Sequence, residues 1–290
     1  MRLLLLGANG QLGTDIFSLS EKKEGVSVAT LGRSHLDVSR VEEVRAVLSE
    51  QDFDVLVNCT GYHKIDEVEG NPSLAFTVNA HAVEAMAEAC DAKRARLVHI
   101  STDYVFGGGD LRRPYLETDC PAPINVYGSS KLMGENLTAL VHEDVLILRV
   151  ASLFGRTRPS GKGRNFVETM IHLGQEKGAL RVVDDIVMSP TASADVAGLI
   201  VKLIDQQAPP GIYHAVNSGW ASWYEFARAI ISGAGISATV EPIPSTEYPT
   251  LAKRPAFSVL DNSKLTLLVG QIPHWSDALN RHLRAMGYVA

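Results

Sequence analysis

The sequence GANGQLG, residues 7–13, directly follows the short apolar run Leu3–Leu6. An apolar run of this length predicts a buried strand, and the glycines predict a tight turn into a helix. Free backbone N–H groups at the start of such a helix can bind a pyrophosphate. The spacing is G-x-x-G-x-x-G rather than G-x-G-x-x-G, but its place between a strand and a helix predicts a dinucleotide-binding turn. We expect its contacts from Gly7, Asn9, Gly10, Gln11, Leu12 and Gly13.

Apolar runs alternate with helical patterns through the first 150 residues. Strands are predicted at residues 3–6, 26–31, 54–58, 97–100 and 145–149. A capping box, Ser39-x-x-Glu42, predicts the start of one helix, and Asn71-Pro72 predicts the start of another that runs to about Asp91. Near-continuous apolar strands separated by helices predict a parallel sheet covered on both faces, which is the doubly wound α/β fold of the Rossmann type.

The alternation becomes less regular after residue 150. Residues 155–163 are rich in Gly, Arg and Pro and predict a long loop. Helices are predicted at residues 165–177, 191–207 and 222–233, the last opened by the capping box Ser222-x-x-Glu225. We therefore expect a dinucleotide-binding domain over residues 1–150, completed by segments within residues 180–217. A smaller, mainly substrate-binding region over residues 151–290 is expected to interleave with it.

Composition excludes several classes of protein. The 290 residues are 46% hydrophobic and 21% charged, with a net charge of −6, so no basic surface for nucleic acid or anionic membrane is expected. No apolar segment is long enough for a membrane span or a signal peptide. The cysteines Cys59, Cys90 and Cys120 are odd in number and widely spaced, which argues against a disulfide framework and favours the reducing cytoplasm. The histidines show no H-x-x-x-H or H-x-H pattern, so no metal site is expected.

The end of the second predicted strand bears on the choice of cofactor. NAD enzymes place an acidic residue there against the ribose 2′-hydroxyl, whereas this chain has Leu31-Gly32-Arg33-Ser34. Arg33, aided by Ser34, could bind the 2′-phosphate of NADP, although a solvated loop arginine is the alternative. The pattern favours NADPH and leaves NADH possible.

A candidate catalytic group lies between the fourth and fifth predicted strands. Tyr127 and Lys131 are four residues apart on a predicted helix, so their side chains share one face. Thr102 lies just beyond the fourth strand, at the sheet edge where ligands bind. A carbonyl that accepts a hydride also needs a proton, and an ammonium beside a tyrosine stabilises its phenolate. The group therefore predicts a reductase site, with an exposed Tyr/Lys helix pair as the alternative.

These stretches resemble the short-chain dehydrogenase/reductase superfamily, in the extended branch that acts on nucleotide sugars. More narrowly, the chain is similar to the dTDP-4-dehydrorhamnose reductase family. The similarity extends over nearly the whole chain, and its most specific part is Asn125–Glu135. The matching stretches are residues 7–13, 101–106, 125–135, 165–166, 190–191, 211–214 and 254–255.

The resemblance implies reduction of the 4-keto group of dTDP-4-dehydro-L-rhamnose to give dTDP-L-rhamnose. It implies a nucleotide-sugar substrate and a chain that works as a monomer or homodimer. Some family members hold magnesium through acidic side chains at a dimer contact, but no such set is matched here and no metal is expected. The catalytic residues implied are Thr102, Tyr127 and Lys131. Cofactor contacts are implied for Gly10, Gln11, Leu12, Asp37, Val38, Gly61, Tyr62 and His63, and substrate contacts for Thr102, Asp103, Asn165 and Arg254.

Some features leave other readings open. Asn165 could be a helix cap and Arg254 a surface charge. Gly61-Tyr62-His63-Lys64 stands where the family more often has an Ala-His-Thr-like run, and Leu153 stands where tryptophan is common, which bears on the identity of the sugar.

Proteins of three other functions resemble the same family: dehydratases, epimerases and a binding protein. Related dehydratases place a glutamate after Thr-Asp, whereas this chain has Tyr104. An epimerase that retains its NAD remains an alternative. So does a non-catalytic binding protein, because the regulatory subunit of methionine adenosyltransferase resembles the same family.

Overall fold

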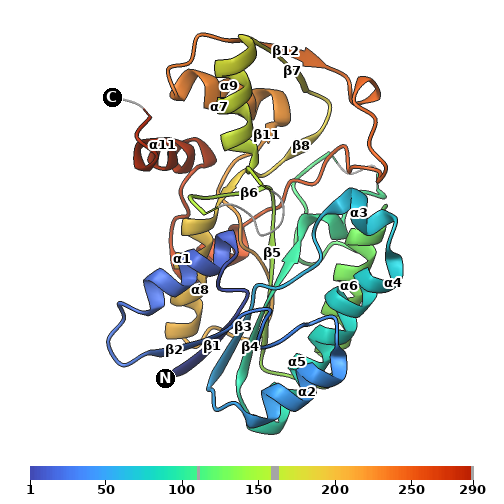
Figure 1. The fold of residues 1–290 in the computed structure, drawn as a ribbon, viewed down its shortest axis with the longest axis vertical. Coiled ribbons are helices and arrows are strands. Elements are labelled where there is room, and N and C mark those ends of the chain that lie inside the picture. Colours follow the sequence, from blue (N-terminus) through green and yellow to red (C-terminus); the bar gives the residue numbers. More distant parts are fainter. Residues whose placement is uncertain (110–111, 158–162, 289–290) are drawn as a thin grey trace.

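A parallel six-stranded sheet forms the centre of the computed structural model, which describes residues 1–109, 112–157 and 163–288 (Figure 1). Its strand order is β10-β5-β4-β3-β1-β2. The order reverses between β1 and β3, which creates the crevice at the carboxyl ends of the strands where such sheets bind ligands. The predicted doubly wound α/β fold is confirmed. The strands are β1 (Arg2–Leu6), β2 (Ser27–Leu31), β3 (Val55–Asn58), β4 (Arg96–Thr102), β5 (Val145–Val150) and β10 (Gly211–His214).

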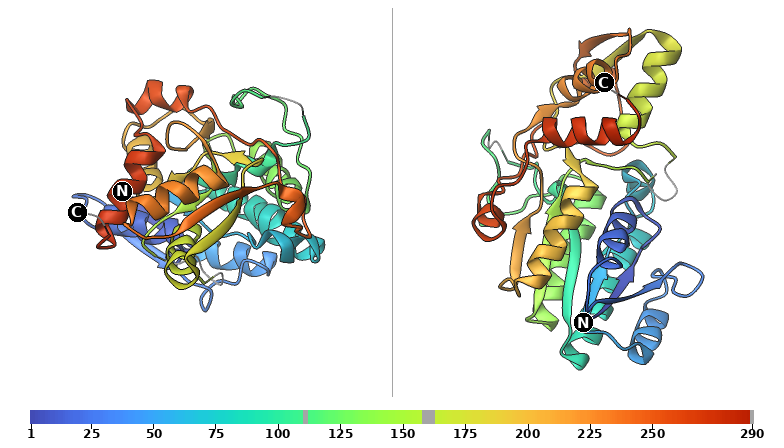
Figure 2. Two further views of the ribbon diagram at one scale, coloured as in Figure 1. Left: turned by 90° about the horizontal axis from the view of Figure 1, so that it is seen from above. Right: turned by 90° about the vertical axis from the view of Figure 1, so that its left-hand side faces the viewer.

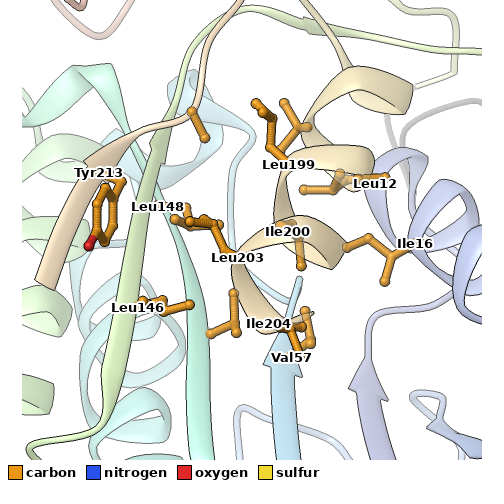
Figure 3. Close-up of a cluster of buried hydrophobic side chains, with 14 of the residues drawn as sticks. Leu12, Ile16, Val57, Leu146, Leu148, Leu199, Ile200, Leu203, Ile204 and Tyr213 are labelled. Carbon is orange, nitrogen blue, oxygen red and sulfur yellow. The ribbon is translucent and has the colours of Figure 1, made fainter. Parts of the chain in front are cut away.

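Helices cover both faces of this sheet. One face carries α1 (Gln11–Ser20) and α8 (Ser193–Asp205), whose Leu12, Ile16 and Ile200 pack on the strands (Figure 3). The opposite face carries α2 (Val41–Glu50), α5 (Ala82–Lys93) and α6 (Val126–Val141). Leu3 and Leu5 of β1 face the first cluster while Leu4 and Leu6 face the second, which explains why this strand is apolar throughout.

Two predicted helix starts differ from the structure. Arg40 precedes α2 without a side-chain cap, because the N–H and hydroxyl of Ser39 donate instead to Asp37 Oδ1 at 3.1 and 2.8 Å. The capping box predicted at Ser39 is therefore wrong. A charged acceptor two residues away captures the serine.

The helix predicted from Asn71 is interrupted. Pro72 does open a helix, but the Asn71 amide donates to the Glu67 carbonyl at 2.8 Å instead of capping it. A π-helical turn then separates two helical pieces. The elements in order are α3 (Ile65–Glu69), α4 (Pro72–Phe76), η1 (Thr77–His81) and α5.

A smaller lobe lies beyond the carboxyl ends of the sheet (Figures 1 and 2). Its core joins three helices, residues 166–177, 223–233 and 275–285, to two short strands, residues 179–183 and 239–243, that pair in parallel. The predicted capping box at Ser222 is confirmed, and a second one joins Asn165 to Glu168. Residues 158–162 of the predicted loop lie outside the described residues. The lobe and its connections contain α7 (Phe166–Lys177), α9 (Trp223–Gly233), α11 (Trp275–Ala285), β7 (Ala179–Val183), β12 (Thr239–Ile243), β8 (Val187–Met188), β11 (Ala221–Ser222), β6 (Leu153–Phe154), β9 (Thr191–Ala192) and η3 (Ser245–Glu247). Outside the lobe, η2 (Asp103–Val105) follows β4, and α10 (Ser263–Val269) packs beside α8 and β10.

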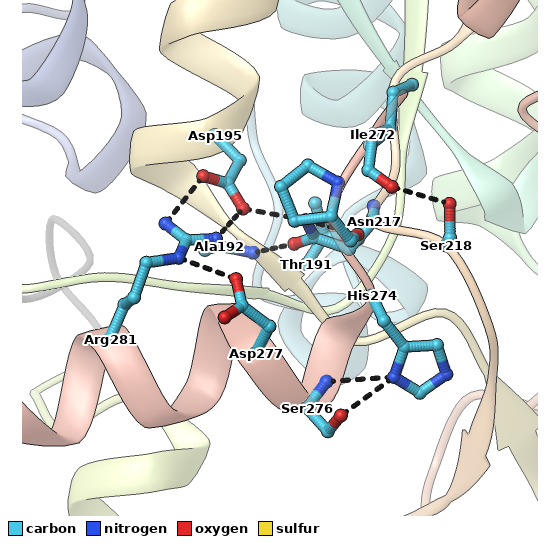
Figure 4. A network of polar contacts seen from close by, with 11 residues as sticks. Thr191, Ala192, Asp195, Asn217, Ser218, Ile272, His274, Ser276, Asp277 and Arg281 are labelled. Carbon is cyan, nitrogen blue, oxygen red and sulfur yellow. Dashed lines mark hydrogen bonds and ion pairs between the residues drawn. The ribbon is translucent and has the colours of Figure 1, made fainter. Parts of the chain in front are cut away.

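A polar network fastens the lobe to the sheet (Figure 4). Arg281 of α11 donates two hydrogen bonds to Asp195 of α8, at 2.9 and 2.7 Å. Asn217 donates to the same carboxylate at 2.7 Å and accepts from the Ala192 N–H at 2.8 Å. Because α8 covers the sheet and α11 belongs to the lobe, these bonds fix the position of the lobe relative to the sheet.

Two further predictions bear on the class of protein. All three cysteines are free, as the absence of a disulfide framework requires. Across residues 1–109, 112–157 and 163–288, no helix is both long and apolar enough to cross a membrane.

Candidate active site

The glycine-rich turn leads from β1 into α1 at the carboxyl edge of the sheet. Gly10 is the N-cap of α1, and its N–H donates to the Gly7 carbonyl at 3.0 Å. A Cβ on Gly13 would lie only 2.2 Å from that carbonyl oxygen, so the helix can press against the turn only with glycine there. No side chain caps α1, and its first turn contains no acidic residue. The start of this helix therefore fits the pyrophosphate of a dinucleotide.

The tip of β2 lies beside this turn. A Cβ on Gly32 would be 3.9 Å from Asn9 Nδ2, which places the Asn9 amide next to the tip. The Arg33 side chain is 88% exposed, and its guanidinium is 4.0 Å from the Asp37 carboxylate. Hydrogen bonds from Ser39 hold the pKa of Asp37 below its usual value. Arg33 therefore remains accessible to an anion, with Ser34 beside it.

Residues 61–63 form a loop that is held from behind by the π-helical turn. Asn79 of η1 accepts from the Tyr62 N–H at 2.8 Å and donates to the Tyr62 carbonyl at 3.0 Å. The His63 ring contacts the Gly61 carbonyl at 3.1 Å. Asn79 also donates to Ser130 of α6 at 3.0 Å, so this loop and the helix that carries the candidate catalytic residues share one anchor.

The first turn of helix α6 is held in place by its N-cap and by a close approach to the segment that follows β4. Its N-cap, Asn125, accepts from the Gly128 N–H at 2.8 Å. A Cβ on Gly128 would lie 2.0 Å from the Tyr104 carbonyl oxygen, so glycine lets the helix approach the segment that follows β4. The rings of Tyr104 and Tyr127 meet edge to face, with centroids 5.7 Å apart.

Tyr127 and Thr102, both predicted as catalytic residues, lie together here. Thr102 is the last residue of β4, its side chain is buried, and it lies near enough to Tyr127 to act against a rise in the pKa of that phenol. Burial outweighs Thr102 and raises the pKa of Tyr127 to about 12. A phenol with this pKa keeps its proton at neutral pH, which is the form needed to donate one to a developing alkoxide.

The prediction that Lys131 stabilises the Tyr127 phenolate stays a prediction, and the structure shows what surrounds the Lys131 amine. The Lys131 amine donates to the Ile100 carbonyl at 2.6 Å and contacts His99 Nε2 at 3.3 Å. Burial lowers the pKa of Lys131 to about 8. The Lys131 amine therefore contacts two residues of β4, and burial is the main cause of the pKa shifts of both Lys131 and Tyr127.

Asp103 and Asn165 point into the protein rather than into open solvent. Asp103 accepts from Ser258 at 2.6 Å and from Thr102 at 3.1 Å, and burial raises its pKa to about 6. Asn165 caps α7 and donates to the Gly155 carbonyl at 2.8 Å and to Gln11 at 3.3 Å. The helix-cap reading of Asn165 therefore holds. The residue joins the smaller lobe to the glycine-rich turn.

Arg254 is more than a surface charge. It donates to Asp66 of α3 at 2.8 Å, and the preceding Lys253 carbonyl accepts from the α6 cap Asn125 at 2.8 Å. Its Nη1 is buried and has no hydrogen-bond partner among the described residues. Arg254 therefore lies near the start of α6, and one nitrogen of its guanidinium has no hydrogen-bond partner among the described residues.

Several residues of the site were missed from the sequence. Asn58 ends the apolar strand β3 and His99 lies in the middle of β4, and a polar residue within a buried strand is a signal that could have identified them. Asp66 and Ser258 carry no local signal, because their partners lie 188 and 155 residues away. No group of three or more His, Cys, Asp or Glu side chains that could hold a metal ion occurs within the described ranges.

Comparison with known proteins supports one family. The model of the RmlD substrate binding domain matches residues 1–287. The chain is 36% identical to the spore coat polysaccharide biosynthesis protein SpsK of Bacillus subtilis, over 98% of this chain and 97% of that protein. It is also 36% identical to the dTDP-4-dehydrorhamnose reductase of Aggregatibacter actinomycetemcomitans, over 98% of each chain. The dTDP-4-dehydrorhamnose reductase of Bacillus anthracis, solved in complex with NADP, is similar with a TM-score of 0.90, 36% identity and coverage of 98% of this chain and 99% of that one.

Proposed function

The chain belongs to the dTDP-4-dehydrorhamnose reductase family, and we propose that it reduces the 4-keto group of a dTDP-linked deoxy sugar with NADPH. The favoured substrate is dTDP-4-dehydro-L-rhamnose, with dTDP-L-rhamnose as product. The observation that carries this is that Thr102 and a protonated Tyr127 lie together at the sheet edge that also carries a glycine-rich turn fitted to a dinucleotide.

The residues divide the chemistry between them. NADPH, when bound, supplies the hydride that is added to the carbonyl carbon. Tyr127 donates its phenolic proton to the carbonyl oxygen, and Thr102 hydrogen-bonds to the same oxygen and orients it. Lys131 holds the cofactor ribose and supports the tyrosine. Residues 1–150, with β10 and α8, would form most of the cofactor site, and residues 151–290 would form most of the sugar site.

The decisive experiment measures NADPH consumption with a panel of 4-keto-6-deoxy nucleotide sugars. We expect turnover with dTDP-4-dehydro-L-rhamnose and stoichiometric formation of the alcohol. A protein that carries bound NAD through purification and interconverts epimers would instead be an epimerase. A protein that binds nucleotide without turnover of any keto sugar would be a binding module.

We further propose that the protein works in the cytoplasm, as a monomer or homodimer.

Arg33 is the residue we assign to cofactor choice. Its exposed guanidinium can form charge-assisted hydrogen bonds to a 2′-phosphate, which NADH lacks. Replacing Arg33 by Ala should therefore weaken NADPH binding about tenfold or more and leave NADH binding nearly unchanged. Fluorescence titration with each cofactor tests this, and Arg40→Ala is the control because that exposed arginine pairs with Glu43. Equal losses for both cofactors would remove Arg33 from phosphate recognition.

Arg254 is the residue we assign to the substrate diphosphate. Its Nη1 is buried without a partner among the described residues, and the following Pro255 restricts the backbone. Arg254→Ala should raise the KM for the nucleotide sugar at least about tenfold with NADPH binding unchanged, because a bidentate contact to the diphosphate is lost.

Steady-state kinetics with each substrate varied in turn measures this effect of Arg254. Arg254→Lys should recover only part of the loss, since an ammonium lacks the planar fork. Arg45→Ala, which removes an ion-paired arginine of α2, is the matched control. An unchanged sugar KM in Arg254→Ala would exclude the assignment.

A further inference from the structure

Lys131 of α6 contacts a short chain of buried polar groups whose hydrogen-bond directions can be assigned. Asn58 ends β3 and pairs in register with His99 of the neighbouring strand β4. Both side chains are fully buried. Asn58 Nδ2 lies 3.2 Å from His99 Nδ1, and His99 Nε2 lies 3.3 Å from the Lys131 amine.

The backbone fixes the first link of this chain. The Thr60 N–H donates to Asn58 Oδ1 at 2.9 Å, and the Thr60 hydroxyl donates to the same oxygen at 2.6 Å. A backbone N–H can only donate, so the atom that faces it must be the amide oxygen. The other end of the Asn58 side chain is therefore the NH2 group, and it donates to His99.

The second link follows from the chemistry of imidazole. A neutral imidazole has one N–H donor and one acceptor nitrogen. Because Nδ1 accepts from Asn58, the proton of His99 must be on Nε2, directed at Lys131. Burial also holds the pKa of His99 well below its usual value, so the ring is neutral.

The third link sets a preference at Lys131. An ammonium has three donors and no lone pair, so it cannot accept the His99 Nε2–H, whereas a neutral amine can. The amine also donates to the Ile100 carbonyl at 2.6 Å. The arrangement therefore destabilises the ammonium form relative to the amine.

We propose that Asn58 and His99 are positioning residues that make Lys131 a readily deprotonated group, able to release a proton in each turnover. This rests on the reductase function proposed above. After Tyr127 gives its proton to the substrate oxygen, the tyrosine must regain one, and the Lys131 ammonium on the same face of α6 can release it. The resulting amine accepts the His99 Nε2–H, and a solvent proton later restores the ammonium.

Other groups around Lys131 do not produce the same preference. Glu135, one turn further along α6, favours the ammonium but is paired with Arg149 at 2.6 Å. Burial raises the pKa of the Cys59 thiol to about 12, so it is neutral. Tyr127, one turn earlier on α6, keeps its proton. Burial and the His99 N–H are thus the features that oppose the charge on Lys131.

The first test reads the tautomer directly and needs no substrate. Protein labelled with ¹⁵N-histidine, with the His99 signals identified by their loss in His99→Gln, should show protonated Nε2 and unprotonated Nδ1. Asn58→Asp supplies a second acceptor oxygen in place of the donor, so the proton should move to Nδ1. An Nδ1–H tautomer in the unaltered protein would overturn the proposal.

The second test follows the charge on Lys131. On enzyme saturated with NADPH, kcat should fall as pH rises above about 8, because less Lys131 is protonated. In Asn58→Asp the decrease of kcat should occur at a pH about one unit or more higher, and the lysine titration followed by NMR should shift by a similar amount. Asn58→Leu removes the amide donor without adding a charge. It should move the pH at which kcat falls and the lysine titration in the same direction, but by less. The difference between the two variants separates the effect of the His99 tautomer from the effect of the added carboxylate.

A control and a clear contrary result complete the design. His142→Gln removes a buried histidine that contacts the Ala95 carbonyl, at the other end of α6, and should leave the profile unchanged. If the tautomer moves in Asn58→Asp but neither the pH profile nor the lysine titration does, the proposal is wrong. If no keto sugar is turned over at all, the reductase assignment fails, while the tautomer and titration still test the relay.

Discussion

Replacing Tyr127 by Phe is expected to lower kcat about 100-fold or more, with little change in NADPH affinity. The ring and its edge-to-face contact with Tyr104 remain, while the proposed proton donor to the carbonyl oxygen is lost. The pKa of about 12 means that the phenol is the populated form at neutral pH, so the hydroxyl is the group available to donate. Single-turnover measurements of NADPH oxidation at saturating substrate would isolate the chemical step.

Tyr104→Phe is the matched control for this variant. It removes a hydroxyl from the other ring of the same pair but leaves Tyr127 and Thr102 in place. Its kcat should stay within about threefold of the unaltered enzyme. Turnover by Tyr127→Phe close to that of Tyr104→Phe would remove Tyr127 from the mechanism.

The parts that could be predicted from sequence are those with a local pattern. The run Leu3–Leu6 and the glycine turn identify β1 and the start of α1, because strand, turn and helix follow within a few residues. The spacing of Tyr127 and Lys131 gives their shared helix face for the same reason. Thr102 could be placed near them because the strand ends of a parallel sheet lie at one edge.

The parts that could not be predicted depend on competition between partners. Ser39 has the right spacing for a cap, but the Asp37 carboxylate is a stronger acceptor and captures it. Burial raises the pKa of Tyr127 to about 12 and lowers the pKa of Lys131 to about 8, and burial is a property of the folded environment that spacing does not report. Asp66, 188 residues before Arg254 in the chain, becomes its partner only through the tertiary fold.

A buried ion pair lies close to the candidate catalytic residues, and we expect its loss to have a large effect on stability. Arg149 of β5 donates to Glu135 of α6 at 2.6 Å, and both side chains are only 2% exposed. Ser101, the neighbour of Thr102, donates to the same carboxylate at 2.5 Å. The network therefore joins the helix that carries Tyr127 and Lys131 to the two strands beside it.

Arg149→Met should lower the free energy of unfolding by about 3–5 kcal/mol, because it leaves the Glu135 carboxylate buried without its counter-charge. Chemical denaturation at pH 7 measures this. The double variant Arg149→Met/Glu135→Leu removes both charges and fills similar volume, so it should recover most of the loss. A single variant that loses less than about 1 kcal/mol would mean that water reaches the carboxylate and screens it.

The double variant also asks why a buried ion pair is kept at this place. If the pair contributes little net stability, its value lies in fixing α6 at one position on β4, since Glu135 accepts from both Ser101 and Arg149. An apolar replacement packs without that directionality, so Tyr127 would be held less firmly against Thr102. We therefore expect the double variant to regain stability but to keep a reduced kcat with an unchanged KM for NADPH. A double variant that regained both stability and full kcat would show that packing alone positions the helix.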